Sequence, residues 1–379
     1  MKRLGLLVGS FDPLHKGHIS IAEDAMRFYR LDSVYFAPLP QNENNSVVLS
    51  LQNRQKLLSS YLKPPFYILD SQEIYKKTGN CYVDALNRLQ AQNPDSALFL
   101  LLGMDTLSLI QNFAPILQIP AVKALIVYPR VGYNSKKVLQ LAQERGAHSM
   151  FFRSIKNLPS SQIIRNQLKE LNDVPEWVPA SVIHQIAREG FYLPDYTATL
   201  KGTLSHSRLM HTLSVRETAV DLAFNYNAPM LKTSVAAMLH DSAKCMPFAQ
   251  MQKIARENHL TEDGEMLSSP ALLHGIVGAH IAKTVYGIQD KDILNAITYH
   301  TVGRAGMTYT ELCVFLADSI EPLREEYPGL AQLRNLAKQD LKAAALACLR
   351  LTKKHILERG GKYSIKAQDT MDDLVRQLS

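Results

Sequence analysis

The first half of the chain alternates short apolar runs with longer amphipathic stretches. The apolar runs, each bounded by turn residues, are LGLLVG (4–9), SVYFAP (33–38), ALFLLLG (97–103) and KALIVYPR (123–130). Helix-like periods lie between them, for example HISIAEDAMRFYR (18–30) and LQNRQKLLSSYL (51–62). Continuous apolar strands that alternate with helices are typical of a parallel sheet covered on both faces. We therefore predict an α/β, Rossmann-like domain in the first half.

The pattern changes after residue 175. The stretch VPASVIHQIAREGF (178–191) predicts the last helix of the first domain, and LPDYTATLKG (193–202), with its proline and glycine, predicts a linker. From residue 204 to 378 almost only amphipathic helical periods follow, which predicts an all-α helical bundle. Because 379 residues exceed the usual size of one domain, we expect two domains, 1–195 and 196–379.

Composition narrows the partners and the compartment. The net charge of +7 comes from 42 basic and 35 acidic residues without a long basic run, so we expect nucleotide phosphates rather than a nucleic acid as the anionic partner. The four cysteines form no CxxC pair and are expected to be reduced. No apolar run is long enough for a signal peptide or a membrane span. These features predict a cytoplasmic protein with no membrane partner, and they leave the formation of a homo-oligomer open.

The stretch GLLVGSFDPLHKGH (5–18) carries the first candidate chemistry. A strand ends at Gly9 and Ser10, a loop follows, and a helix begins near His18. Backbone N–H groups at a helix N-terminus suit an anion, and Gly17 allows close approach of the backbone. The two imidazoles of His15 and His18 can stabilise charge that develops on a transferring phosphoryl group. The stretch matches neither the GxGxxG pattern nor the P-loop pattern.

GSFDPLHKGH (9–18) resembles the opening of the HxGH nucleotidyltransferase superfamily, and specifically the bacterial nicotinate mononucleotide adenylyltransferases. LLGMDTL (101–107), VYPR (127–130) and PSSQIIR (159–165) resemble later segments of that family, in the same order. The resemblance implies that nicotinate mononucleotide attacks the α-phosphorus of ATP with Mg²⁺ assisting, giving nicotinate adenine dinucleotide and pyrophosphate. It assigns catalytic roles to His15 and His18, and nucleotide binding to Gly9, Ser10, Phe11, Gly103, Asp105, Arg130, Ser160, Ser161 and Arg165.

Three departures from that family lie where the nicotinate pocket is expected. PLPQNENNS (38–46) replaces a P-P-H-K-like segment, NCYVDAL (80–86) lacks two expected threonines, and Phe113 stands where the family usually has tryptophan. Adenylyl transfer is therefore expected, and a different acceptor nucleotide is kept as the alternative.

The second half carries a set of histidines and aspartates. The segments are RLMH (208–211), LHDSAK (239–244), LLHG (272–275), YHT (299–301) and LADSIEP (316–322). Imidazoles combined with carboxylates suit a divalent transition metal such as iron or manganese better than calcium. A metal lowers the pKa of its bound water, which makes hydrolysis of phosphoesters or phosphoanhydrides feasible near neutral pH.

These segments resemble the HD phosphohydrolase superfamily, and in particular its bacterial branch that splits dinucleoside tetraphosphates symmetrically. The resemblance implies hydrolysis of diadenosine tetraphosphate to two ADP with a divalent metal, iron being expected. Two alternatives stay open, namely that His274 and His300 hold a second metal, and that this half senses a nucleotide without hydrolysing it. The implied metal ligands are His211, His240, Asp241 and Asp318; Lys244, His274 and His300 are catalytic, and Arg208, Thr301 and Arg324 contact substrate phosphates.

Overall fold

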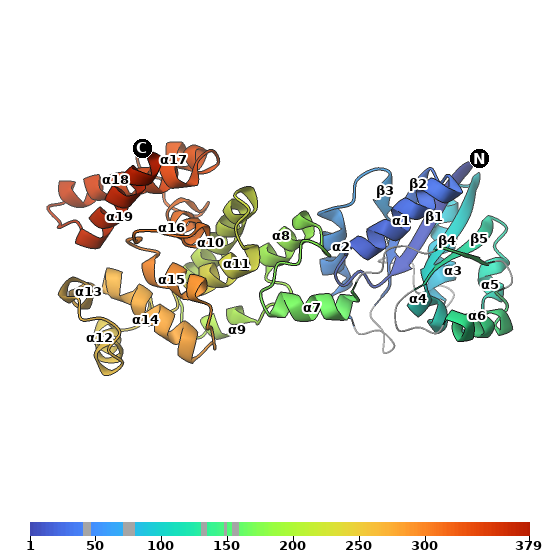
Figure 1. Cartoon of the computed structure of the whole chain (residues 1–379), viewed down its shortest axis with the longest axis horizontal. Coiled ribbons are helices and arrows are strands. Elements are labelled where there is room, and N and C mark those ends of the chain that lie inside the picture. The colour runs from blue at the N-terminus through green and yellow to red at the C-terminus, as the bar shows by residue number, and fades with distance from the viewer. Residues whose placement is uncertain (41–46, 71–79, 130–134, 148–149, 154–158) are drawn as a thin grey trace. The chain divides into compact units, whose positions relative to one another are not determined.

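The computed structural model describes residues 1–40, 47–70, 80–129, 135–147, 150–153 and 159–379 (Figure 1). These residues form two compact units. The first comprises Met1–Glu170 and Val174–Gln185, and the second comprises Leu171–Asp173 and Ile186–Ser379. The boundary between the two compact units therefore lies between residues 185 and 186. The domain boundary expected at residue 195 stays a prediction.

The first unit contains a six-stranded parallel sheet in the order β3-β2-β1-β4-β5-β6. The four predicted strands are confirmed, and two strands of three residues each at the sheet edges are too short to give a sequence signal. The chain order reverses between β1 and β4, and ligands of open α/β sheets bind at such a point, beyond the carboxyl ends of the strands. The strands are β1 Lys2–Gly9, β2 Ser33–Pro38, β3 Phe66–Ile68, β4 Ser96–Gly103, β5 Val122–Tyr128 and β6 Met150–Phe152.

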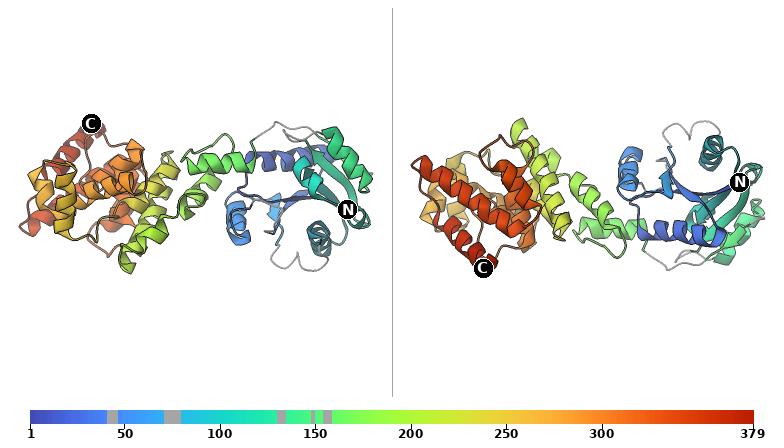
Figure 2. Two further views of the ribbon diagram at one scale, coloured as in Figure 1. Left: turned by 90° about the horizontal axis from the view of Figure 1, so that it is seen from below. Right: turned by 90° about the horizontal axis from the view of Figure 1, so that it is seen from above.

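Helices cover this sheet, as the continuous apolar strands predict. Helix α1 packs across β1, β2 and β4 (Figures 1 and 2), and α3 and α5 contribute to a core that also contains side chains of β1, β4 and β5. The Rossmann-like fold class is confirmed. The helices of this part of the chain are α1 Lys16–Tyr29, α2 Leu51–Ser59, α3 Cys81–Gln92, α4 Met104–Leu109, α5 Ala114–Leu117, α6 Ser135–Glu144, α7 Ser161–Lys169 and α8 Ala180–Glu189.

The second unit is helical throughout its described residues, which confirms the predicted all-α class. At its centre α10, α11, α15 and α16 pack against one another. Nine of the ten residues of α11 are buried, because this helix is apolar around its whole circumference. The helices are α9 Tyr196–Leu200, α10 His206–Asn225, α11 Met230–Leu239, α12 Phe248–Glu257, α13 Gly264–Ser268, α14 Pro270–Thr284, α15 Lys291–Tyr299, α16 Tyr309–Ile320, α17 Leu330–Ala337, α18 Leu341–Glu358 and α19 Ile365–Leu378.

The predicted linker at 193–202 is wrong. Asp195 accepts hydrogen bonds from the N–H groups of Thr197 and Ala198 and so caps helix α9. Tyr196 and Leu200, one helical turn apart, are buried in the core of the second unit. The sequence does not predict this single turn, because a proline and a glycine flank it and its two apolar positions are too few to show a helical period. Among the described helices, none has both the length and the apolar character that a membrane span requires.

Candidate active sites

The loop between β1 and α1 places the imidazoles of His15 and His18 against each other. His15 is the N-cap of α1, and its Nδ1 accepts a hydrogen bond from the N–H of Gly17 at 3.1 Å. The N–H of His15 donates to Nδ1 of His18 at 3.3 Å, and the two rings stack with centroids 3.8 Å apart. Because each Nδ1 is an acceptor, each neutral ring carries its proton on Nε2. Both histidines therefore offer an Nε2–H donor, as stabilisation of phosphate charge requires.

The same loop depends on Gly9 and Phe11. A Cβ atom on Gly9 would lie 3.2 Å from the Phe11 ring, closer than side chains ordinarily pack. Phe11 has a φ of 48° and is fully buried, and its ring lies edge-on to His18 at 4.9 Å. Phe11 thus packs against His18, and Ser10 beside it is half-buried.

Arg54 of α2 anchors this loop, and the sequence analysis did not predict this role. Its buried guanidinium donates to three carbonyl oxygens, those of Ser10 at 2.6 Å, Leu39 at 2.7 Å and Leu49 at 3.2 Å. Arginine usually faces water on an amphipathic helix. The sequence does indicate the burial of Arg54, because it precedes Leu57 and Leu58 by three and four positions and so lies on the apolar face of the helix.

We expect Arg54→Met to destabilise the first unit by about 3 kcal/mol or more, because charge-assisted hydrogen bonds contribute about 1.5–3 kcal/mol each and the carbonyls would stay buried. Denaturant unfolding followed by tyrosine fluorescence and circular dichroism measures the change. Arg88→Met on the exposed face of α3 is the control and should cost less than about 0.5 kcal/mol. Equal effects of the two substitutions would contradict the anchoring role.

Helix α7 brings the segment PSSQIIR to this loop. Ser160 caps α7 by accepting the N–H of Ile163 at 3.4 Å, and Ser161 begins the helix. The buried Arg165 donates from Nη1 to the backbone carbonyl of Asp12 at 2.6 Å and from Nη2 to Gln162 at 2.6 Å. The predicted phosphate-binding segment and the HxGH loop are therefore adjacent, and Arg165 joins them.

Other predicted nucleotide contacts are placed less fully. Gly103 ends β4 beside β1 and is the N-cap of α4. Arg130 and residues 41–46 lie outside the described residues, as does the side chain of Asp105. Two of the backbone N–H groups that were expected to bind an anion already have acceptors within the protein. The N–H of Lys16 donates to the carbonyl of Trp177, and that of Gly17 donates to Nδ1 of His15. Phe113, which stands where the resembled family usually has tryptophan, is a fully buried core residue.

In the second unit the predicted metal ligands converge from three helices. His211 lies on α10, His240 and Asp241 follow α11, and Asp318 lies on α16. His211 Nε2 is 3.0 Å from Asp318 Oδ1 and 3.9 Å from Asp241 Oδ2. His240 Nε2 is 3.5 Å from Asp241 Oδ2 and 3.9 Å from Asp318 Oδ1. His211, His240 and Asp318 form one group of possible metal ligands, with atoms within 4.8 Å of one another, and Asp241 lies beside it.

Hydrogen bonds of the histidines show why this group suits a cation. Nδ1 of His240, His274 and His300 faces a backbone carbonyl, of Ala237 at 2.7 Å, Pro270 at 3.3 Å and Ile297 at 2.8 Å. A carbonyl only accepts, so each Nδ1 carries the proton and each Nε2 presents a lone pair. Nε2 of the buried His240 has no hydrogen-bond partner among the described residues. Lone pairs and carboxylates that meet in this way repel one another unless a cation lies between them.

His274, His300 and Lys244 lie on the other side of Asp241. His274 Nε2 is 3.1 Å from Asp241 Oδ1, 3.0 Å from His300 Nε2 and 3.2 Å from Lys244 Nζ. Burial is the main cause that lowers the pKa of His274 to about 4, against the opposing effect of the Asp241 carboxylate, which would stabilise a proton on Nε2. His240, Asp241 and His300 form a second group with ligand geometry. The ammonium of Lys244 would repel a second divalent ion there, which favours one metal.

The predicted phosphate contacts surround this centre. Arg208 donates to Asp241 Oδ2 at 2.9 Å, and Arg324 donates to Asp318 Oδ1 at 3.1 Å. Their side chains are 29% and 37% exposed, whereas Asp241 is 2% exposed, so the arginines form the solvent side of the cluster. Thr301 follows His300 directly and is half-buried.

Glu321 is a site residue that the sequence left without a role. It is buried, and its Oε1 accepts the hydrogen bond of His211 Nδ1 at 3.0 Å. Burial raises the pKa of Glu321, but hydrogen bonds from Ser214, His211 and the N–H of Leu323 outweigh it and lower the pKa. A carboxylate on the outer nitrogen of a ligand histidine fixes its tautomer and raises its basicity.

We expect Glu321→Gln to weaken divalent-metal affinity about 10- to 100-fold, the usual effect of losing such a carboxylate. Metal titration of the full-length chain, with Mn²⁺ or Fe²⁺ under anaerobic conditions, measures it. Glu325→Gln, an exposed neighbour, is the control. Unchanged affinity in the Glu321 variant would show that His211 needs no such partner.

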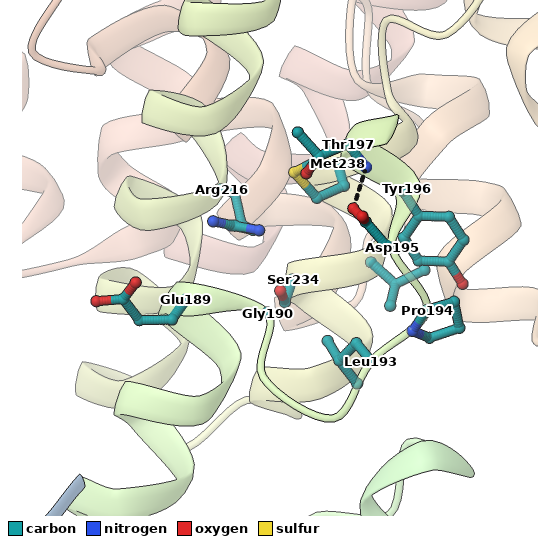
Figure 3. Close-up of a pocket in the computed structure, with 11 residues that line it drawn as sticks. Glu189, Gly190, Leu193, Pro194, Asp195, Tyr196, Thr197, Arg216, Ser234 and Met238 are labelled. Atoms are coloured by element: carbon teal, nitrogen blue, oxygen red, sulfur yellow. Dashed lines mark hydrogen bonds between the residues drawn. The ribbon is translucent and has the colours of Figure 1, made fainter. Parts of the chain in front are cut away.

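A further pocket of about 120 Å³ lies where the end of α8 meets α9, α10 and α11 (Figure 3). Arg216 lines it together with the carboxylates of Glu189 and Asp195. No predicted site residue lines this pocket, and the acidic groups offset the one guanidinium, so we assign it no ligand.

Comparisons with known proteins match each half of the chain to a family. The cytidylyltransferase-like family model matches residues 6–167, and the HD domain model matches residues 208–323. A Mycoplasma genitalium protein named "probable nicotinate-nucleotide adenylyltransferase/Ap4A hydrolase" is 28% identical over 354 residues, which cover 90% of this chain and 95% of that protein. The symmetrical bis(5'-nucleosyl)-tetraphosphatase of Bacillus subtilis is 39% identical over 166 residues, covering 43% of this chain and 86% of that enzyme.

One solved structure is similar to the second half. It is described as a predicted HD superfamily hydrolase involved in NAD metabolism from Clostridium acetobutylicum, with 36% sequence identity and a TM-score of 0.47. The match covers 48% of this chain and 95% of that one.

Proposed function

The chain belongs to the HD-domain family through its second half and has a cytidylyltransferase-like first half, and from this we propose that it is a bifunctional enzyme of nucleotide metabolism. The first half transfers AMP from ATP to nicotinate mononucleotide, giving nicotinate adenine dinucleotide and pyrophosphate. The second half hydrolyses diadenosine tetraphosphate to two ADP. One relative is named for both activities, and this chain matches 95% of its length, which supports the pairing.

The observation that carries the transferase proposal is the hydrogen bonding of the stacked histidines, which assigns their tautomers. With Nδ1 of each ring occupied as an acceptor, His15 and His18 present two Nε2–H donors side by side. The phosphate of nicotinate mononucleotide attacks the α-phosphorus in line, the bond to the bridging oxygen breaks, and pyrophosphate leaves with that electron pair. The donors stabilise the charge that develops on the phosphoryl oxygens. Mg²⁺ bound with ATP would neutralise further phosphate charge.

Convergence of His211, His240, Asp241 and Asp318 carries the hydrolase proposal. These residues would hold one divalent transition metal, for which we propose iron because imidazole and carboxylate ligands suit it. A metal held there would lower the pKa of a water molecule and so make hydrolysis feasible near neutral pH. Lys244, His274 and His300 lie within reach of the same centre and would hold the phosphates, and Arg208 and Arg324 would bind them on the solvent side.

Pyrophosphate release tests the first activity and its acceptor. The full-length chain is given ATP and Mg²⁺ with nicotinate mononucleotide, nicotinamide mononucleotide or 4'-phosphopantetheine. We expect the highest kcat/KM with nicotinate mononucleotide. A preference for another acceptor would show that the departures at residues 38–46 and 80–86 have changed the pocket.

Product analysis tests the second activity. The metal-loaded chain is expected to convert diadenosine tetraphosphate to ADP alone, since symmetrical cleavage gives two identical products. Formation of AMP and ATP would contradict the symmetry. Tight binding of metal and nucleotide without release of ADP would favour a nucleotide sensor instead.

A further inference from the structure

The loop that joins α15 to α16 is held by the last helix of the chain. This loop, residues 301–308, begins directly after His300 and leads into the helix that carries Asp318. The buried hydroxyl of Thr370 on α19 lies 3.0 Å from the carbonyl of Val302 and 2.8 Å from the carbonyl of Lys366 in its own helix, so its one proton is shared between these two acceptors. One turn further along, Asp373 Oδ2 accepts the N–H of Gly306 at 2.8 Å. Two side chains of α19 thus bind two backbone groups of the loop.

The approach of helix and loop depends on Gly303. Its φ is 69°, and a Cβ atom there would lie 2.6 Å from Cγ2 of Thr370, closer than real side chains approach. The N–H of Gly303 also donates to the carbonyl of Tyr299 at 2.8 Å, which closes the end of α15 beside His300. One short, hydrogen-bonded turn therefore connects Thr370 to the backbone that carries His300.

The start of α19 makes a second connection. Lys366 Nζ is 3.1 Å from Asp263 Oδ2, and this ion pair lowers the pKa of Asp263. Asp263 caps α13, which directly precedes the helix that carries His274. Helix α19 therefore contacts the segments before His274 and after His300, the two imidazoles that lie 3.0 Å apart. It does so from outside the HD domain match, which ends at residue 323.

We propose that α19 is a positioning element of the hydrolase site, in which Thr370 and Asp373 hold the loop that fixes His300 and Thr301 against the substrate phosphates. This inference rests on the proposed hydrolase function. Ala367, Met371 and Leu374 are buried and attach the helix by apolar contacts, whereas Thr370 and Asp373 both contact the backbone of one loop. Small displacements of phosphate-binding groups are costly, since a shift of about 1 Å can lower a rate about 100-fold.

Thr370→Val tests the inference, because valine keeps the shape and the burial and removes the hydroxyl. We expect kcat for diadenosine tetraphosphate to fall about 10-fold or more, with unchanged metal content and unchanged adenylyl transfer in the same chain. Thr370→Ser restores the hydroxyl and should recover most of kcat. Thr233→Val is the matched control, since that threonine is equally buried and its hydroxyl donates to Pro229, four residues back, as that of Thr370 does to Lys366.

The outcomes separate this inference from the function on which it rests. Equal kcat losses in Thr370→Val and Thr233→Val, or no rescue by serine, would overturn the positioning role while wild-type hydrolysis stands. Absence of ADP release by the metal-loaded wild-type chain would instead refute the hydrolase, and the inference with it. Asp373→Ala removes the acceptor of the Gly306 N–H at a side chain that is 18% exposed; if Thr370→Val fails to fold, an unaltered kcat in this variant overturns the proposal.

Discussion

Asp241→Asn is expected to remove the metal from the second unit and to lower hydrolysis of diadenosine tetraphosphate by at least about 100-fold, more than the loss of an outer-shell partner costs. Asp241 contacts both parts of the cluster. Its Oδ2 lies 3.5 Å from His240 Nε2, and its Oδ1 lies 3.1 Å from His274 Nε2. The neutral amide keeps the size but supplies no charge to a divalent ion, and its NH₂ group would face a lone pair.

Metal content by mass spectrometry and ADP release together measure this effect. The control is Asp221→Asn, which alters a partly exposed ion pair with Arg188 elsewhere in the same unit. Adenylyl transfer by the Asp241 variant should equal that of the wild type, and an unchanged circular dichroism spectrum should show that the helical second unit is folded. Retention of a full metal equivalent with ordinary affinity would mean that the ion binds elsewhere.

His18→Ala is expected to lower adenylyl transfer about 100- to 1000-fold, which corresponds to about 2.7–4 kcal/mol of transition-state stabilisation. The alanine variant loses one of the two Nε2–H donors. It also loses the Nδ1 acceptor that receives the N–H of His15 at 3.3 Å, so the orientation of the other ring is weakened. His18→Gln keeps a side-chain amide donor and should retain more activity than alanine.

Steady-state kinetics with ATP and nicotinate mononucleotide measure this change, which should fall mainly on kcat because the charge is greatest in the transition state. Hydrolysis by the second unit is the internal control and should be unchanged. A His18→Ala variant with near-normal kcat would exclude the imidazole pair as the source of catalysis.

Both candidate clusters could be read from the sequence because their residues stand in short ordered segments. HKGH places His15 and His18 one helical turn apart at a helix start, and HDSAK sets His240 beside Asp241 whatever the rest of the fold does. Four strands were predictable for a similar reason. Each is a run of six to eight mostly buried residues, so the apolar signal is continuous.

Other features gave too little local signal. Arg54 has the appearance of a solvated helix residue, and its three carbonyl acceptors come from separate segments. Glu321 lies within a quoted motif, but its partner His211 is far away in the chain. The single turn of α9 was taken for a linker because a proline and a glycine flank it.

By itself the sequence determined the classes of the two halves, the order of the motifs and the chemical identity of the groups that meet, since apolar periodicity and residue type are local properties. Only the tertiary structure decided which nitrogen of each histidine faces its site, which buried charges hold the loops, and that α19 reaches the turn after His300. Those properties depend on hydrogen bonds between segments far apart in the chain, and no local pattern encodes them.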